Sequence, residues 1–100
     1  MIRVEDIIVK DKKELDVDIA HLVNVGHHAF KGRREIHAKG FMNEGKNNAI
    51  SQIIKLAERL EANLAVIEKE HFHKKGIYKA IVGFYKNLYD VNKVEIGNSY

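Results

Sequence analysis

The sequence predicts an α+β fold, a two-layer α/β sandwich in the order β-α-β-α-β-β, with a four-stranded sheet and two helices on one face. Three observations lead to this prediction. Apolar side chains recur at three- and four-residue spacing over residues 49–60, as they do in an amphipathic helix. Apolar runs of strand length flank that helix on both sides. Residues 64–86 alternate as two strands around a short glycine-containing turn, which is typical of a β-hairpin.

The first part of the chain supplies one strand and one ambiguous segment. Residues 3–10 contain an Ile-Ile-Val core that predicts the first strand, and the polar residues 11–14 end it. Residues 15–30 alternate at their start like a strand, but they also fit one face of a helix, and two early acids favour the helix. We interpret residues 15–30 as the first helix and keep a strand over 15–25 as the alternative.

The central helix is the best-marked element. A second strand over residues 34–39 precedes it, and a loop over 41–48 offers Asn43, Asn47 and Asn48 as candidate N-caps. After the helix, Glu61-Ala62-Asn63 supplies the stop, because Asn tolerates the left-handed conformation. The side chains predicted to be buried on its inner face are Ala49, Ile50, Ile53, Ile54, Ala57 and Leu60.

The hairpin completes the sheet. Its strands cover residues 64–72 and 77–86, and a basic turn over 73–76 joins them. Residues 1–86 are therefore expected to form one domain, with residues 87–100 as a tail that is either an extra strand or disordered. Phe84 is expected in the core, whereas Phe72, Tyr78 and Tyr85 fit either the core or a surface on which bases stack.

Composition and motifs narrow the class of protein. The chain has 100 residues, 45% hydrophobic and 31% charged, as an ordinary globular domain has. Without a long uncharged apolar run and without Cys, we expect a cytoplasmic protein that does not interact with membranes. No phosphate-binding loop, nucleophile elbow or zincin motif is present, so we expect neither an enzyme nor a cofactor. His71 and His73 lie two residues apart, but structural zinc normally takes four ligands, so we predict no metal site.

Basic residues gather at three loop-like places in this layout: Lys12-Lys13 after the first strand, Arg33-Arg34 before the second, and Lys74-Lys75 in the hairpin turn. Residues 31–40 hold four basic residues against one acid, and residues 69–79 show the same balance. Lysines in loops neutralise phosphates without needing fixed geometry, although ordinary solvated charge at turns is the simpler alternative. The candidate contacts with DNA or RNA are Lys12, Lys13, Arg33, Arg34, Lys39, Lys74, Lys75 and Lys79.

Three short pieces carry a resemblance to a known family. The segments IIVKDKKE, EIHAKG and HFHKKGIYK, in this topology, resemble the Alba family of small nucleic-acid-binding proteins. By position, Lys12 and Lys13 match that family's phosphate-contacting pair, and Lys74 and Lys75 match its basic hairpin arm. The C-terminal domain of bacterial translation initiation factor three has the same topology, and residues 63–86 are similar in layout to its last two strands. Both resemblances imply non-catalytic binding of DNA or RNA, and the first implies a homodimer.

A second resemblance points to a different class. The segment AERLEANLAVIEKEHFHKKGIYKAIVGF also resembles the helix-strand-hairpin end of YbjQ-like and Rcs-sensor-lipoprotein domains, which are assembly or envelope-signalling modules. It implies an oligomeric module that does not bind nucleic acid, with a strand over residues 15–25 and no role for the basic clusters.

Overall fold

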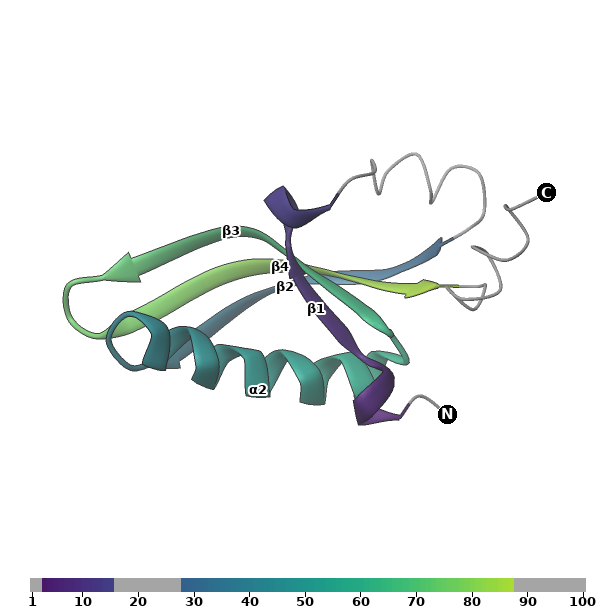
Figure 1. The fold of residues 1–100 in the computed structure, drawn as a ribbon, viewed down its shortest axis with the longest axis horizontal. Coiled ribbons are helices and arrows are strands. Elements are labelled where there is room, and N and C mark those ends of the chain that lie inside the picture. The colour runs from purple at the N-terminus through teal and green to yellow at the C-terminus, as the bar shows by residue number, and fades with distance from the viewer. Residues whose placement is uncertain (1–2, 16–27, 88–100) are drawn as a thin grey trace.

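The computed structural model describes residues 3–15 and 28–87. Four strands form one mixed sheet in the order β1-β3-β4-β2, and helix α2 (Asn43–Leu60) packs on one of its faces (Figure 1). The strands are β1 (Ile8–Asp11), β2 (His28–Lys39), β3 (Leu64–His73) and β4 (Ile77–Asn87). β1 runs parallel to β3, whereas β4 pairs antiparallel with both β3 and β2. The α+β class and the four-stranded sheet are thus confirmed.

The core lies between α2 and the sheet. α2 buries Gly45, Ala49, Ile53 and Ala57, which share one face at four-residue spacing. The predicted stripe was partly wrong, because Ile50 and Ile54 are only half-buried. Leu60 packs against the core as predicted, and so does Leu56, which the prediction left out. The sheet contributes alternate residues to the same cluster, including Ile36, Ala38, Ala65, Ile67, Tyr78, Ala80, Val82 and Phe84.

The start of α2 differs from the prediction. We expected a loop over residues 41–48 and an asparagine N-cap, but the helix begins at Asn43 and its N-cap is Met42, whose side chain makes no capping bond. The turn is abrupt because Gly40 and Gly45 touch: a Cβ added to Gly45 would lie 2.6 Å from the Gly40 carbonyl oxygen. Asn48 lies inside the helix, and its side-chain amide donates to the Lys39 carbonyl at 2.7 Å.

The end of α2 also uses a different residue from the predicted one. Glu61, not Asn63, adopts the left-handed conformation, with φ 56°. The N–H of Ala62 then donates to the Ala57 carbonyl at 2.8 Å, which closes the last turn. Asn63 instead links strands, since its N–H donates to Tyr85 and its carbonyl accepts from the N–H of Ile8.

The first part of the chain was predicted least well. The strand expected over residues 3–10 is replaced by the 3-10 turn η1 (Val4–Asp6), the short strand β1 and a second 3-10 turn, η2 (Lys12–Glu14). β2 begins at His28 instead of residue 34, so residues 28–30 of the expected first helix are strand. Leu15, where that helix was expected to begin, is extended and ends η2. Residues 16–27 lie outside the described residues, and α2 is the single α-helix among those described.

The hairpin is confirmed. β3 and β4 pair over almost their whole length, with one irregularity in register between Ile67 and Lys69. The turn that joins them lies beside the start of α2, where the Gly40 N–H donates to the Gly76 carbonyl at 2.8 Å (Figure 1). β4 extends to Asn87, so only residues 88–100 of the expected tail fall outside the described part of the chain.

Candidate functional site

The sheet has one face that α2 does not cover, which we call the open face. Strand side chains alternate, so Tyr78, Ala80 and Val82 point toward α2 while the odd-numbered residues of β4 point the other way. Cross-strand pairing places three rows on the open face near the hairpin turn. From β2 through β4 to β3, the rows are Lys39–Ile77–His73, His37–Lys79–His71 and Glu35–Ile81–Lys69.

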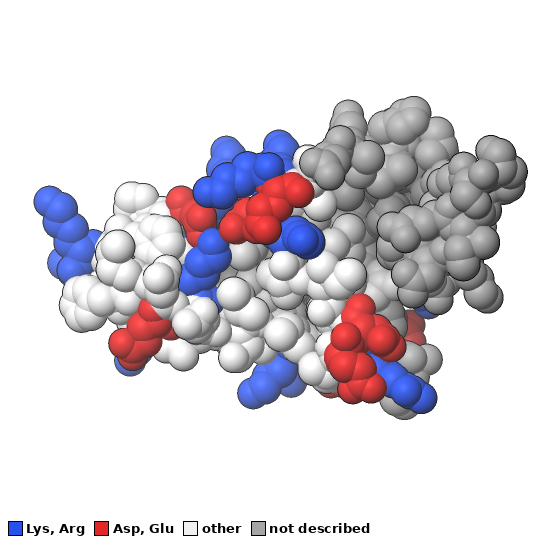
Figure 2. Space-filling model, in the orientation of Figure 1, with Lys and Arg blue, Asp and Glu red and all other residues white. Residues whose placement is uncertain are grey.

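Three lysines cross these rows on a diagonal. Lys39 on β2, Lys79 on β4 and Lys69 on β3 occupy successive rows, and diagonal neighbours on one face of a sheet lie about 7–8 Å apart. We call this set the lysine diagonal. Among the described residues, none of the three ammonium groups has an ion-pair partner. Lys74 and Lys75 extend the positive charge onto the exposed hairpin turn, the end of the molecule where Figure 2 shows blue atoms at the far left.

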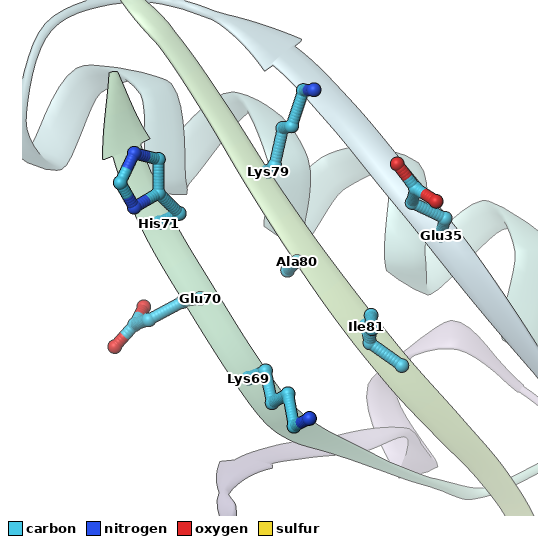
Figure 3. Close-up of a pocket in the computed structure, with 7 residues that line it drawn as sticks. All are labelled: Glu35, Lys69, Glu70, His71, Lys79, Ala80 and Ile81. Atoms are coloured by element: carbon cyan, nitrogen blue, oxygen red, sulfur yellow. The ribbon is translucent and has the colours of Figure 1, made fainter. Parts of the chain in front are cut away.

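A cavity of about 340 Å³ lies along the lysine diagonal, and we call this cavity the hollow. Figure 3 shows Glu35 of β2, Lys79 and Ile81 of β4, and Lys69 and His71 of β3 around it. Glu70 also lines it but points away, because its carboxylate bonds to residues on the α2 side. The hollow therefore has an apolar floor at Ile81, the ammonium groups of Lys79 and Lys69 on two strands, and the carboxylate of Glu35 on the third.

Histidines surround the centre of the diagonal. His37 and His71 flank Lys79 in the middle row, and the rings of His71 and His73 meet edge to face with centroids 4.2 Å apart. Desolvation lowers the pKa of His73, and the neighbouring charges of His71, Lys79 and His37 lower it further. Among residues 3–15 and 28–87, no three His, Asp or Glu side chains are grouped so that they can hold a metal ion.

On the half of the open face away from the hairpin turn, Arg33 and Glu68 form an ion pair. The Arg33 guanidinium donates to both carboxylate oxygens of Glu68, at 2.7 and 2.9 Å, and the hydrogen bond to Glu68 raises the pKa of Arg33. The pair crosses β4 over Gly83, where an added Cβ would lie 2.7 Å from the Glu68 carboxylate. Tyr85 is buried beside it. Arg33 is thus already paired with an acid.

The predicted basic residues fall into two groups. Lys39, Lys74, Lys75 and Lys79 lie together on the open face and its turn. The other four do not join them. Arg34 is paired in register with Val82, on the α2 side of the sheet, and Lys12 and Lys13 are exposed in η2 at the edge beyond β3. Lys69 belongs to the basic segment 69–79 but was not among the predicted contacts, and its place on the diagonal follows only from the register of β3 against β4.

A polar network on the α2 side was also missed. Lys46 Nζ lies 3.0 Å from Asp11 Oδ2 and 3.2 Å from Glu70 Oε1, and the Tyr78 hydroxyl donates to Glu70 at 2.8 Å. Burial alone would lower the pKa of Lys46, but the bonds to both carboxylates outweigh it and raise the pKa. Burial and the bond to Glu70 raise the pKa of Tyr78. Because each group has a partner, we interpret the network as structural, joining α2 to three strands.

Among the described residues, the Phe and Tyr side chains offer no stacking surface on the hairpin half of the open face. Phe84 is in the core as predicted, and Tyr78 and Tyr85 are buried as well. Phe72 is partly exposed but stands edge-on against Tyr78, with ring centroids 5.1 Å apart. The exposed large apolar residues at this end of the molecule include Ile77 at the start of β4 and Phe41, whose ring lies against Gly76 of the hairpin turn.

Comparison with protein-family models, with curated proteins and with solved structures finds no match for this chain. Among the described residues, no helix has the length and apolar character needed to cross a membrane.

Proposed function

We propose that this chain is a small non-catalytic nucleic-acid-binding protein that contacts phosphates with the open face of its sheet and with the hairpin turn. The lysine diagonal is the observation that carries the proposal. Lys39, Lys79 and Lys69 present ammonium groups without acidic partners among the described residues, on three adjacent strands of the sheet. A regular track of cations suits a polymer with one negative charge on each unit.

The surroundings of the diagonal strengthen the same proposal. Lys74 and Lys75 continue the track of positive charge beyond the sheet, onto the exposed hairpin turn. Glu35 is the acid closest to the diagonal in register, and its carboxylate bonds to His37. We assign a secondary role to the other four predicted basic residues. Arg33 is already paired with Glu68, and Arg34, Lys12 and Lys13 lie away from the lysine diagonal.

The alternative is an oligomeric assembly module, and the free edge of the sheet at β2 gives it less support than the lysine diagonal gives nucleic-acid binding. β2 is a long edge strand, and unpaired edges are the usual sites of strand addition. Here three carbonyls on β2 accept hydrogen bonds from side chains: Arg33 from Arg34, His37 from Gln52, and Lys39 from Asn48. These bonds blunt the edge against a second chain. The homodimer implied by the Alba resemblance stays a prediction.

Fluorescence anisotropy with labelled DNA and RNA oligonucleotides at low salt tests the proposal. We expect dissociation constants in the micromolar range, typical of non-specific binding (about 10⁻⁴ to 10⁻⁶ M at physiological salt). The double variant Lys69→Ala/Lys79→Ala is expected to bind roughly tenfold more weakly, if each contact contributes about 0.7 kcal/mol. Lys55→Ala/Arg59→Ala removes the same charge from the exposed side of α2 and should have little effect.

Two results would count against the proposal. If the anisotropy does not change at tens of micromolar protein, the proposal of nucleic-acid binding is refuted. Equal weakening by the two double variants would show that net charge matters and that the diagonal does not.

A further inference from the structure

We propose that the hollow takes one unpaired nucleobase, so that the protein prefers single-stranded over duplex nucleic acid and prefers bases that carry an exocyclic amino group. This inference rests on the proposed function and specifies which form of nucleic acid the open face binds.

The size and lining of the hollow suit a single base. Its volume of about 340 Å³ is at the lower end of the range for small-ligand pockets, roughly 300–1,000 Å³. Ile81 lies in the row between Glu35 and Lys69, so the middle of the floor is apolar and the polar groups stand at its sides (Figure 3). An apolar floor with a few convergent polar groups is the usual design of such pockets.

A base can reach this floor only when it is free of its partner strand. In a duplex the base faces are stacked and the Watson–Crick edges are paired, so that a flat protein surface contacts mainly phosphates. Bases in single strands can be splayed out, placed against a side chain and hydrogen-bonded along their edges. The lysine diagonal runs past the hollow, with Lys79 and Lys69 on two of its sides, so phosphates next to a bound base would find cations within reach.

Glu35 gives the hollow a preference among bases. An ionised carboxylate accepts hydrogen bonds and donates none. One Glu35 oxygen bonds to His37, and the group retains further acceptor capacity toward the hollow. Cytosine and adenine can donate from their amino groups, and a carboxylate accepting from cytosine N4 is a known form of base recognition. Uracil and thymine present a carbonyl oxygen at the corresponding position, which the carboxylate repels.

Competition anisotropy on the full chain tests this inference, with a labelled 20-nucleotide oligo-dC as probe. Competitors are oligo-dT, a duplex of the same length and mixed sequence, and cytidine monophosphate. We expect oligo-dC to compete about fivefold better than oligo-dT, the effect of roughly one hydrogen bond, and better than the duplex. Glu35→Gln should reduce the difference between oligo-dC and oligo-dT, while the loss of its negative charge strengthens binding of both.

A second variant tests the floor of the hollow. Ile81→Asn keeps the number of side-chain heavy atoms but makes the side chain polar. It should reduce the preference for single strands without changing duplex affinity, because duplex binding relies on the lysines. Ile8→Asn is the matched control, since Ile8 is an exposed isoleucine on the same face of the sheet, in β1 and outside the hollow. Circular dichroism verifies that both variants are folded.

The possible results are separable. Equal binding of single strands and duplex, still weakened by Lys69→Ala/Lys79→Ala, overturns the inference and leaves the proposed function standing. Equal binding of oligo-dC and oligo-dT by the wild type overturns the role of Glu35. Competition by cytidine monophosphate at the same molar concentration as oligo-dC assigns the hollow to a free nucleotide instead of a polymer. Absence of binding to every probe overturns both proposals.

Discussion

Gly45→Ala is expected to destabilise the protein, although the same change in most helices is stabilising. Gly45 is a buried residue in the first turn of α2. A Cβ at this position would lie 2.6 Å from the Gly40 carbonyl oxygen and 2.9 Å from Tyr78 Cβ. Neither atom is the free end of a flexible side chain, so relief requires movement of the Gly40 turn or of α2 itself.

Two effects of opposite sign set the magnitude. Alanine gains about 1 kcal/mol over glycine in a helix interior. Overpacking a filled site costs about 1–3 kcal/mol, and the backbone contact at 2.6 Å points to the upper end of that range. The steric term therefore prevails, and the free energy of unfolding should fall by about 2 kcal/mol. For a domain of this size that corresponds to a decrease in Tm of roughly 8–16 °C.

Thermal and urea unfolding followed by circular dichroism measure this change. Asn47→Ala is the control, because Asn47 is exposed in the same helix and the change should gain up to about 0.7 kcal/mol from helix propensity alone. If Gly45→Ala were as stable as the wild type, or more stable in the way the control is, the close contact between Gly40 and Gly45 would be refuted.

Three further predictions concern charged groups. Lys46→Met should lower the free energy of unfolding in urea by about 2 kcal/mol, because two partly buried carboxylates lose their cation; an unchanged midpoint would contradict this. The pKa of His73 is lower in the folded state, so the unfolded chain binds more protons near pH 6. The free energy of unfolding should therefore fall as the pH drops below about 6.5. This fall should be smaller in His73→Gln. Glu68→Ala releases Arg33 and should strengthen nucleic-acid binding in the anisotropy assay, whereas weaker binding would argue against phosphate contacts on this face.

The elements predicted well were those with a strong local pattern. The spacing of Ala49, Ile53 and Ala57 marks α2, and the alternation around the Gly76 turn marks the hairpin, because each signal is complete within a short stretch. The start of α2 could not be found in this way. It depends on the contact between Gly40 and Gly45, which is visible only when the turn is closed.

The long edge strand β2 shows a different limit. Residues 28–33 are mixed in polarity and lack a clear alternation, so the sequence favours neither helix nor strand there. They become strand because β4 provides hydrogen-bonding partners far along the chain, from Gly83 to Asn87. Pairing of this kind is set by the whole sheet, and the preference of a single segment does not reveal it.

The candidate site was predicted in part for the same reason. Counting charges by segment identified Lys39, Lys74, Lys75 and Lys79, which the fold brings to one end of the open face. Lys69 was counted in the same basic segment, 69–79, but it was not chosen as a contact, because only strand register places it beside the other lysines. Counting charges could not show that Arg33 is neutralised, since its partner Glu68 is 35 residues away.

The salt dependence of nucleic-acid binding tests the central claim most directly. If lysines on the open face and turn neutralise phosphates, the logarithm of the binding constant falls linearly with the logarithm of salt concentration, by about 0.7 for each phosphate contacted on a single strand. Lys74→Ala/Lys75→Ala should then make the slope shallower by about 1.4, while Lys55→Ala/Arg59→Ala leaves it unchanged. A slope near zero in the wild type, or the same slope in all three proteins, would contradict phosphate binding by this surface.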